Sequence, residues 1–368
     1  MAQSHTHRPR VVLEGCNGDW AQRHYLPFLA GKAGKGEIDL WITDLGRPLL
    51  RTQEFLRKIG ETDRYIDKSG GLGRYRTLTD IDYVFIVVPD RYHSEVAQFW
   101  LERSDRLAPE GKIFIEKPLD AFARSALKLW EFAQHRPNTV YGFDHYLARA
   151  YPFLRSASQY LGEIGRVMAI DFRILEPEEI PPHRVRALSK GIILDLFCHV
   201  LAVIGAVVER RTSPSVVSLS SVRLEEVKVA QYRDSPIPGE TLAQIRFTIG
   251  QSNSQRIEVT SWIGKGVRDR EKLMMIGGDR GRSIKLDFAA DQAWLLGSRE
   301  QRELTELYPN HVESFLEEAL QGASPNSTPG VLEFEAALEI LMISDEAKMR
   351  AGESSSYNAG ESIVSGLI

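Results

Sequence analysis

The chain has 368 residues, of which 43% are hydrophobic and 26% charged, and its formal net charge is -4 at pH 7. This length exceeds what one hydrophobic core usually supports, so we expect two domains. Because the charges of both signs are spread along the chain, it offers no basic face to a phosphate backbone, and we expect no nucleic-acid partner.

The first ten residues, MAQSHTHRPR, are polar and lack the apolar segment of a signal peptide. The two cysteines, Cys16 and Cys198, lie far apart in the chain, and no further Cys or paired His stands at metal spacing. We therefore expect neither a disulfide framework nor a bound metal, and these features favour a cytoplasmic protein.

Short β-rich runs alternate with helical patterns between residues 10 and 142. Strand followed by helix, repeated, predicts parallel βαβ units, and the apolar run FIVV predicts a sheet that is covered on both faces. We expect residues 1–142 to form a Rossmann domain that binds NAD or NADP. The expected strands are RVVLEG, EIDLWIT, YVFIVVP, KIFIE and TVYGF, and the expected helices are 19–31, 48–59, 93–103 and 121–134.

The first expected strand runs into a turn that contains Gly15 and Gly18 and then into a helix. Glycines at such a turn let backbone N–H groups reach a pyrophosphate, and the helix N-terminus adds favourable partial charge. The turn has one glycine fewer than G-x-G-x-x-G, so a plain turn is the alternative. The expected cofactor-binding residues of this turn are Gly15, Asn17, Gly18, Asp19 and Trp20.

The second expected strand ends at Asp44. An acid at this place accepts hydrogen bonds from the adenine ribose and repels a 2′-phosphate, which favours NAD. Arg47, three residues later, could instead bind that phosphate, so NADP stays an alternative.

The strand KIFIE ends in Glu116, Lys117 and Pro118, at the edge where open parallel sheets bind their ligands. A lysine near the nicotinamide could donate a hydrogen bond to a substrate oxygen and favour the alkoxide that precedes loss of hydride. A solvated lysine at a strand end is the alternative.

Longer runs with alternating polarity follow residue 142. They predict an α+β domain with a large, mostly antiparallel sheet over residues 143–368, which would bind substrate and form oligomers. A Ser- and Gly-rich tail from about residue 352 is expected to be mobile. The expected strands are RVMAIDFRI, SVVSLSSVRLEEVKVAQY, TLAQIRFTI and QRIEVTSWI, and the expected helices are 191–208, 311–320 and 330–350.

The run from Gly191 to Val208, GIILDLFCHVLAVIGAVV, is the most apolar of the chain, yet it contains Asp195 and His199. Two polar residues near its centre argue against a membrane span and favour a helix buried in protein. Residues four apart share one face of a helix, so both side chains could point into one cleft, whereas Cys198 should point elsewhere and belong to the core. A structural ion pair is the alternative.

Three motifs in order, namely the Gly15 loop, IFIEKPLD at 113–120 and G-x-x-x-D-x-x-x-H at 191–199, resemble the Gfo/Idh/MocA family of oxidoreductases (the glucose-fructose oxidoreductase and inositol dehydrogenase type). The resemblance covers nearly the whole chain. It implies that Lys117 contacts cofactor and substrate, that Asp195 binds a substrate hydroxyl and that His199 is the general acid and base. It also implies that Pro89 and His93 lie beside the nicotinamide and that Glu116 belongs to the cofactor site.

Two segments, GDWAQRHYLPFL at 18–29 and DHYLARA at 144–150, are similar to glucose-6-phosphate dehydrogenase. This similarity implies that Asp144 orients His199 and that His145, Tyr146 and Arg149 bind a phosphate. Whether Asp195 or Asp144 orients His199 stays open at this stage. A basic segment at 182–190 adds a second indication of an anionic substrate, with a solvated loop as the alternative.

The resemblance implies an NAD(P)-dependent enzyme that transfers hydride between nicotinamide and a hydroxyl or carbonyl carbon of a sugar, a sugar phosphate or a cyclic polyol. One alternative is a reductase or dehydrogenase of a non-sugar carbonyl compound. Another is a catalytically inactive regulatory protein that binds a dinucleotide. A homodimer or homotetramer is expected, because a broad sheet in the second domain needs a cover.

Overall fold

The computed structural model of the chain describes residues 8–60, 64–70, 78–103, 105–136, 138–177, 191–231, 241–250, 256–268, 270–322 and 327–355. The chain divides into two compact units. The first unit contains Met1–Phe143 and Val312–Thr328, and the second contains Asp144–His311 and Pro329–Ile368. Residues 312–328 thus belong with the first unit, which differs from the expected assignment of all of 143–368 to the second domain.

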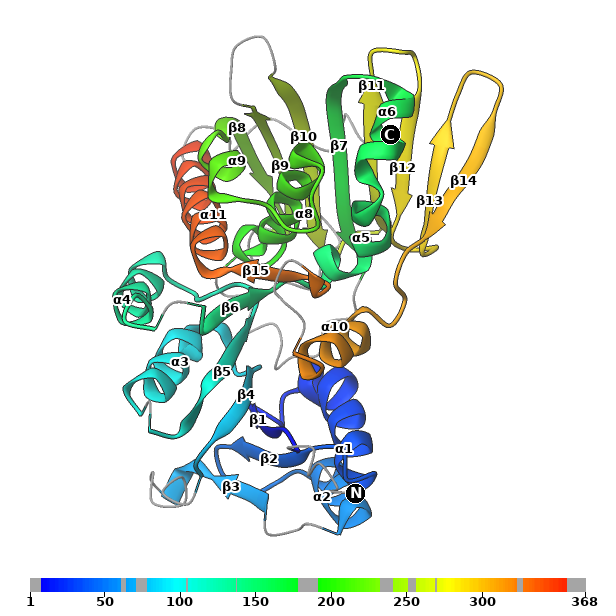
Figure 1. Cartoon of the computed structure of the whole chain (residues 1–368). Coiled ribbons are helices and arrows are strands. Elements are labelled where there is room, and N and C mark those ends of the chain that lie inside the picture. The colour runs from blue at the N-terminus through cyan, green and yellow to red at the C-terminus, as the bar shows by residue number, and fades with distance from the viewer. Residues whose placement is uncertain are drawn as a thin grey trace. The chain divides into compact units, whose positions relative to one another are not determined.

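The first unit contains a parallel sheet with the strand order β6-β5-β4-β1-β2-β3 (Figure 1). This is the Rossmann order, in which the direction of winding changes between β1 and β4. The strands are buried over most of their length, as a sheet with helices on both faces requires. Their bounds are β1 (Arg10–Glu14), β2 (Asp39–Asp44), β3 (Tyr65–Asp67), β4 (Ile81–Ile86), β5 (Leu107–Glu116) and β6 (Val140–Phe143).

Helices cover this sheet, and α10 explains why a late segment belongs to the first unit. Phe315 of α10 stacks on Phe143 with ring centroids 3.9 Å apart and meets Phe114 edge-on at 5.3 Å. Such aromatic packing on the strands adds dispersion energy to the burial of apolar surface. The helical elements are η1 (Ala21–Tyr25), α1 (Leu26–Gly34), α2 (Leu50–Ile59), η3 (Lys68–Gly70), η5 (Asp90–Tyr92), α3 (His93–Glu102), α4 (Ala123–Ala133) and α10 (His311–Leu320).

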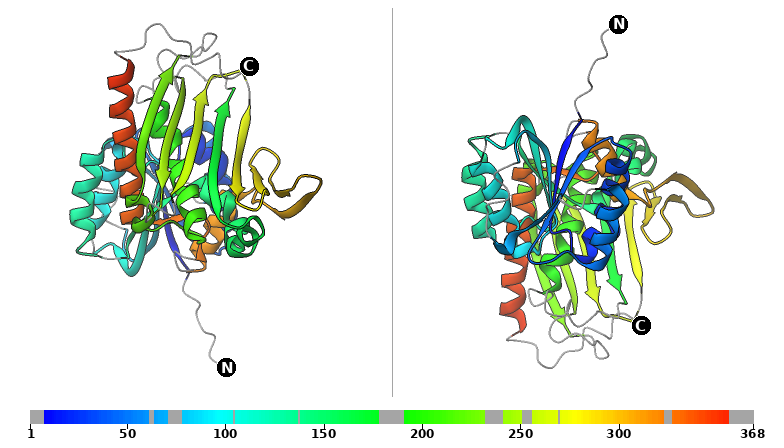
Figure 2. Two further views of the ribbon diagram at one scale, coloured as in Figure 1. Left: turned by 90° about the horizontal axis from the view of Figure 1, so that it is seen from above. Right: turned by 90° about the horizontal axis from the view of Figure 1, so that it is seen from below.

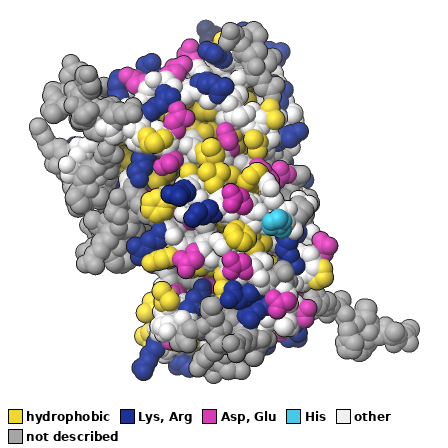
Figure 3. All heavy atoms as spheres, turned by 90° about the vertical axis from the view of Figure 1, so that its left-hand side faces the viewer, with side chains coloured by type: hydrophobic (Ala, Val, Ile, Leu, Met, Phe, Trp, Pro, Cys, Tyr) yellow, Lys and Arg dark blue, Asp and Glu magenta, His cyan; other side chains and the backbone are white. Residues whose placement is uncertain are grey.

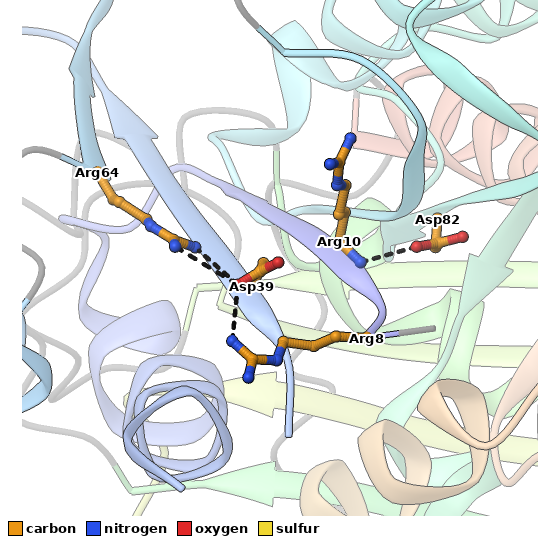
Figure 4. Close-up of polar contacts among 5 residues, drawn as sticks. All are labelled: Arg8, Arg10, Asp39, Arg64 and Asp82. Carbon is orange, nitrogen blue, oxygen red and sulfur yellow. Dashed lines mark hydrogen bonds and ion pairs between the residues drawn. The ribbon is translucent and has the colours of Figure 1, made fainter. Parts of the chain in front are cut away.

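Ion pairs hold the amino-terminal ends of the central strands (Figure 4). Asp39 Oδ1 lies 3.3 Å from a guanidinium nitrogen of Arg8 and 3.3 Å from one of Arg64, while Asp82 Oδ2 accepts the backbone N–H of Arg10 at 2.7 Å. Pairs as exposed as Arg8 with Asp39 stabilise a protein by at most about 1 kcal/mol. They lie at the edge of the sheet opposite to the carboxyl ends of its strands.

The second unit contains an eight-stranded sheet with the order β14-β13-β12-β11-β7-β10-β9-β8. Only β7 and β10 run parallel, and the other described pairs are antiparallel, so the prediction of a mostly antiparallel sheet is confirmed. The strands are β7 (Val167–Glu176), β8 (Arg223–Ala230), β9 (Leu242–Ile249), β10 (Ile257–Lys265), β11 (Glu271–Gly278), β12 (Ser283–Asp287), β13 (Gln292–Leu296) and β14 (Gln301–Glu306).

Several helices pack on this sheet (Figure 2). They are α5 (His145–Arg155), α6 (Ala157–Ile164), η7 (Ile193–Phe197), α8 (Cys198–Glu209), α9 (Val216–Ser220) and α11 (Phe334–Ser355), with the short strand β15 (Val331–Glu333) before α11. Every residue of α8 from Cys198 to Val207 is buried, so the apolar run is a core helix as predicted. None of the helices within the described ranges is long and apolar enough to cross a membrane.

One expected strand is wrong in its first half. The segment 215–232 was expected to be extended throughout, but Val216–Ser220 forms the helix α9 and β8 begins only at Arg223. Pro214 lies before this helix, and Glu209 accepts hydrogen bonds from the backbone N–H and the hydroxyl of Ser215. This local hydrogen bonding turns the chain before the strand pairing begins.

The described surface carries mixed charge. On the face shown in Figure 3, basic side chains are interspersed with acidic ones over the coloured residues, and no broad area of a single sign is visible among them. This distribution agrees with the small net charge of -4.

Candidate functional site

Gly15 begins the loop between β1 and the first helix, and only glycine fits there. Its φ of 87° lies in the left-handed region, and a Cβ on it would lie 2.8 Å from the backbone of Val87. The N–H groups of Gly15 and Cys16 both donate to the carbonyl of Thr43, at 2.9 and 3.1 Å. The loop is therefore held against β2 and β4, where the two halves of the Rossmann sheet meet.

Asp44 and Asn17 fasten the tip of this loop. One oxygen of Asp44 accepts the N–H of Asn17 at 2.7 Å, and the other accepts the N–H of Leu45 at 2.7 Å. The Asn17 carbonyl oxygen accepts the Leu49 N–H and the Thr52 hydroxyl at 3.1 and 3.0 Å. Burial raises the pKa of Asp44, although these two N–H groups lower it. The sequence did not reveal that both residues shape the loop.

The other residues predicted in this loop have separate partners. Asp19 forms an ion pair with Arg23 at 3.0 Å. Arg47 is exposed, and its carbonyl lies 3.5 Å from Asn17 Nδ2. Burial raises the pKa of the Cys16 thiol, which makes the thiolate inaccessible near neutral pH.

Glu116 connects the end of β5 to the first helix. Its Oε1 accepts hydrogen bonds from Trp20 Nε1 at 2.7 Å and from the Tyr25 hydroxyl at 2.8 Å. Burial raises the pKa of Tyr25 well above its usual value, and Glu116 adds to the rise, so the phenol stays a donor. The structure thus gives Glu116 and Trp20, both predicted to contact cofactor, partners within the protein.

The turn after Lys117 is fixed from two sides, and the peptide bond between Lys117 and Pro118 is cis. His93 Nδ1 lies 2.8 Å from the carbonyl of Pro118, and its Nε2 lies 2.7 Å from the carbonyl of Val88, next to Pro89. Burial lowers the pKa of His93, although the two carbonyls oppose this. His93 therefore joins the loop after β4 to the turn after β5, and both loops lie at the carboxyl edge of the sheet.

A buried cluster behind the Gly15 loop was not anticipated. Glu14 is fully buried, accepts a hydrogen bond from Trp100 Nε1 at 2.8 Å and contacts the Thr43 hydroxyl and the Lys68 ammonium group. An acid at the end of the apolar strand RVVLE is the only signal of this cluster in the sequence. Because Glu14 directly precedes Gly15, this cluster anchors the start of the loop.

Asp144 and His199 form a buried pair in the second unit, which answers the open question about the orientation of His199. Asp144 Oδ2 lies 2.6 Å from His199 Nδ1, and the two side chains are 1% and 0% exposed. Asp144 is also the N-cap of α5, where its Oδ1 accepts the Leu147 N–H at 2.8 Å. Its role as the cap of α5 holds the Asp144 carboxylate in place, and the carboxylate in turn orients the imidazole of His199.

The rings of His145 and Tyr146 pack beside His199, with centroids 4.2 and 4.7 Å from its ring. The Tyr146 hydroxyl is buried and has no hydrogen-bond partner among the described residues. Burial raises the pKa of Tyr146 well above its usual value, and Glu176 adds to the rise, so this hydroxyl is a potential donor to a ligand oxygen. The structure thus brings these two predicted residues to the predicted base.

Arg149, the third residue predicted to bind phosphate, lies against an acid. Its Nε and Nη2 are 2.6 and 2.5 Å from Asp291 Oδ1. Asp291 stands 142 positions away in the sequence, and no motif indicated it. The carboxylate offsets much of the charge that a phosphate would meet.

Asp195 has a partner other than His199. Its Oδ2 lies 2.5 Å from the ammonium group of Lys265, which also lies 3.7 Å from Glu176. Lys272 lies 2.6 Å from Glu176 on the other side. Asp195 is 30% exposed and pairs with Lys265, whereas the imidazole of His199 pairs with Asp144.

Cys198 lies nearer the dyad than expected. It was predicted to point elsewhere, but its sulfur and the ligand atoms of Asp144 and His199 all lie within 4.8 Å of one another. Within the described ranges these three residues are the group that could hold a metal ion. The basic segment at 182–190 and the tail from residue 356 lie outside the described residues.

Comparisons with known proteins agree with this architecture. No protein-family model matches the sequence, and no curated protein sequence matches it significantly. Among solved structures, the UDP-N-acetylglucosamine 3-dehydrogenase GnnA of Acidithiobacillus ferrooxidans is 18% identical, with a TM-score of 0.63 over 94% of this chain and 99% of that chain. A Gfo/Idh/MocA family oxidoreductase of Vibrio cholerae is 16% identical, with a TM-score of 0.63 over 95% and 99% of the two chains.

A third similar structure binds a different kind of molecule. The biliverdin reductase of Synechocystis, in complex with biliverdin and NADP+, is 17% identical, with a TM-score of 0.66 over 94% of this chain and 100% of that chain. At such low identities the likeness defines the fold. The chain has the two-domain fold of the Gfo/Idh/MocA oxidoreductases, and the fold class inferred from the sequence is confirmed.

Proposed function

We propose that the chain is an NAD(P)-dependent oxidoreductase. It transfers a hydride between nicotinamide and a hydroxyl or carbonyl carbon of a sugar, a sugar phosphate or a cyclic polyol. The observation that carries the proposal is the buried pair of Asp144 and His199, an arrangement suited to a general base. The first unit supplies the dinucleotide site and the second supplies the proton chemistry.

The residues around Gly15 fit a dinucleotide. A Cβ on Gly15 would fill the space against Val87, and the helix that follows begins without a side-chain cap, so its N–H groups suit a pyrophosphate. Asp44 keeps lone pairs for a ribose hydroxyl, which favours NAD, whereas the exposed Arg47 suits the additional phosphate of NADP. The bound nicotinamide would accept or supply the hydride.

The proton follows from the geometry of the dyad. Asp144 accepts the Nδ1–H of His199, which leaves the lone pair on Nε2 to take a proton from a substrate hydroxyl. The carboxylate then stabilises the imidazolium that forms. In the direction of reduction, Nε2 returns the proton to the new alkoxide. Lys117 at the end of β5 would donate to the same substrate oxygen and Asp195 would bind a neighbouring hydroxyl.

The structure favours a neutral part of the substrate beside Arg149, because Asp291 already pairs with that guanidinium. His145 and Tyr146 remain the proposed substrate ligands next to the dyad. A phosphorylated sugar stays within the proposal only if it displaces Asp291 or binds elsewhere.

Two alternatives have observations of their own. The likeness to a biliverdin reductase fits a substrate other than a sugar. A regulatory protein without turnover would need only the first unit, so a closed Asp144–His199 pair argues against it. The open face of the large sheet, with half-buried Leu273, Met275 and Trp294, suits a homodimer or homotetramer, and we place the protein in the cytoplasm.

The test is absorbance of reduced nicotinamide with NAD and NADP across a panel of sugars, polyols, sugar phosphates and biliverdin. With the best substrate, His199→Asn should lower kcat by about 10²- to 10⁴-fold with unchanged cofactor affinity. His135→Asn, on an exposed histidine of the first unit, is the matched control and should keep full activity. Full turnover of His199→Asn would overturn the acid–base assignment.

A further inference from the structure

A cavity lies within the second unit, away from the Asp144–His199 pair. Its volume is about 1250 Å³, and it is lined by the ends of α6, α8 and α9, the beginnings of β7 and β10, and the turn between β11 and β12. His199 stands at the beginning of α8, whereas Val207 of the same helix lines the cavity. Their separation of eight positions corresponds to about 12 Å along a helix axis, so the cavity is a separate place from the proposed catalytic residues.

Arginine dominates the polar lining of this cavity. Five arginines face two acids, Glu209 and Asp279. The arginines are Arg166, Arg210, Arg211, Arg256 and Arg280. The described lining therefore carries a formal charge of +3, whereas the whole chain carries -4. A local excess of guanidinium groups against the sign of the whole protein raises the local concentration of anions.

Both acids are already used within the protein. The Glu209 carboxylate accepts the hydroxyl and the N–H of Ser215. Asp279 accepts the N–H of Arg166 at 3.0 Å and lies 3.6 Å from its Nε. In contrast, no ion pair involves Arg210, Arg211 or Arg256 within the part of the chain that the structure describes. Three guanidinium groups are thus available to an external anion.

The part of the lining formed by Arg166 and Arg280 is held by hydrogen bonds within the protein. Arg280 donates from Nη1 to the carbonyl of Gly162 at 2.8 Å, a neutral partner that orients the guanidinium without removing its charge. Gly165 has a φ of 83°, and a Cβ on it would lie 2.2 Å from Asp279 Oδ1 and 2.9 Å from Arg280 Cγ. Glycine therefore lets the β11–β12 turn lie close to the end of α6.

The part of the lining at the end of α8 includes a residue in an unfavourable conformation. Arg210 follows the end of α8 with φ 56° and ψ 43°, a left-handed conformation in which glycine or asparagine is preferred. Its N–H caps the carbonyl of Val207, and the N–H of Arg211 caps that of Ala206. The carbonyls that would repel an anion at a helix C-terminus are thereby satisfied. An arginine where glycine would be more stable indicates that the side chain has a use.

The floor of the cavity is apolar and includes exposed side chains. Met168 is 43% exposed and Val217 is 59% exposed, and both line the cavity together with Val167, Val207 and Ile257. Several arginines in separate parts of the lining suit a ligand with more than one phosphate group, and the floor suits an organic body of moderate size.

We propose that this cavity binds an organic polyphosphate of nucleotide size, with its phosphates on Arg210, Arg211 and Arg256 and its apolar part on Met168 and Val217. The site is separate from the dinucleotide loop, so the proposal does not depend on the proposed function.

The experiment measures binding to the full chain by isothermal titration calorimetry at constant ionic strength. The probes are ATP, inorganic tripolyphosphate and uncharged adenosine. Since ATP could also bind the Gly15 loop, the difference between the wild type and Arg210→Glu/Arg211→Glu isolates the cavity. That variant should weaken tripolyphosphate at least 10-fold and abolish one of two ATP sites. Arg268→Glu/Arg299→Glu makes the same charge change at exposed arginines outside the lining and should change both affinities less than 2-fold.

A second variant separates binding from folding. Arg210→Gly relieves the left-handed conformation, so it should raise the melting temperature while it weakens tripolyphosphate several-fold. Absence of saturable binding by ATP and tripolyphosphate, or equal weakening by the two charge-reversal variants, would overturn the proposal. It would also be overturned if Arg210→Glu/Arg211→Glu changed only the oligomeric state, since the cavity would then be an interface between copies of the chain.

Discussion

The carboxylates beside the Gly15 loop and those beside His199 have different kinds of partner. In the first unit, Glu116 and Asp44 accept hydrogen bonds from N–H and O–H groups that do not titrate near neutral pH. In the second, Asp144 and Asp195 face the ionisable groups of His199 and Lys265. Carboxylates of the first kind hold a loop in shape, whereas those of the second kind can respond to a proton. The comparison separates residues that we propose to bind the dinucleotide from residues that we propose to take part in the reaction.

Removing the charge of Asp144 should have the largest effect. In Asp144→Asn the side-chain oxygen can still cap α5, but the amide would donate to His199 Nδ1 and move the ring proton to Nε2. The base would then be lost with the helix intact. We expect kcat to fall by about 10²- to 10⁴-fold.

Steady-state kinetics, a cofactor titration and a melting curve test this prediction. Cofactor affinity should be unchanged, and the melting temperature should stay close to that of the wild type, because asparagine is an equally good cap. A variant that kept full kcat would show that Asp144 only caps the helix.

Replacing Gly15 tests the binding unit. Gly15→Ala adds a Cβ that meets the Val87 backbone at 2.8 Å and opposes a φ of 87°. The loop must move, and we expect affinity for the dinucleotide to fall about 10- to 100-fold, or about 1.4 to 2.7 kcal/mol. Fluorescence of the bound reduced cofactor measures this affinity.

The matched control is Gly31→Ala in α1, where a Cβ meets nothing within 4 Å. That variant should bind as the wild type and be equally or more stable, because alanine favours a helix. Equal losses in both variants would mean that the loop geometry is not what holds the cofactor.

Glu116 should stabilise the fold mainly as a hydrogen-bond acceptor, and its negative charge should contribute less. In Glu116→Ala the donors of Trp20 and Tyr25 lose their acceptor in a largely buried place, which should lower the free energy of unfolding by about 1 to 3 kcal/mol. Glu116→Gln keeps a carbonyl acceptor and should lose less than half of that. Urea unfolding measures the free energy of unfolding of both variants. A larger loss of stability in Glu116→Gln would show that the negative charge itself is required.

Replacement of Glu176 should have the smallest effect on stability, and this effect should depend on pH. Burial acts to raise its pKa, but the ammonium groups of Lys265 and Lys272 outweigh it and leave the pKa below its usual value. A lowered folded-state pKa stabilises the protein above the unfolded-state pKa of about 4.3 and loses this effect as the pH falls through the folded-state value.

Melting curves between pH 3 and 7 test this expectation. The difference in stability between wild type and Glu176→Gln should be largest, about 1 kcal/mol, above pH 5 and should shrink toward pH 3. A difference that grew on acidification would contradict the lowered pKa.

Much of the fold followed from local pattern. The alternation of strands and helices before residue 142 predicted the parallel sheet, because burial on both faces leaves a continuous apolar signal. The Gly15 turn was recognisable because its backbone conformation excludes other residues. The helix α9 was missed, since its few residues follow the same alternation as a strand and only the hydrogen bonds of Ser215 distinguish them.

The sequence predicted which residues belong to the candidate site but not which residues they pair with. Asp144, His145, Tyr146 and His199 do come together, because sequence motifs mark residue types that chemistry needs. Asp291 and Lys265, the partners of Arg149 and Asp195, lie beside and within strands of a sheet whose order no local pattern reveals. The five arginines that line the cavity come from four separate places in the chain, so only the folded structure shows them together.

The different partners of Asp195 and His199 have a consequence for how such an enzyme could diversify. Asp195 pairs with Lys265 at the end of β10, which also lies near Glu176 at the end of β7, whereas His199 pairs with Asp144. Changes at the ends of β7 and β10 can therefore alter the surroundings of Asp195 while the Asp144–His199 pair stays as it is. Descendants of such a chain could acquire new substrates through changes near Lys265 and Glu176 without rebuilding their chemistry.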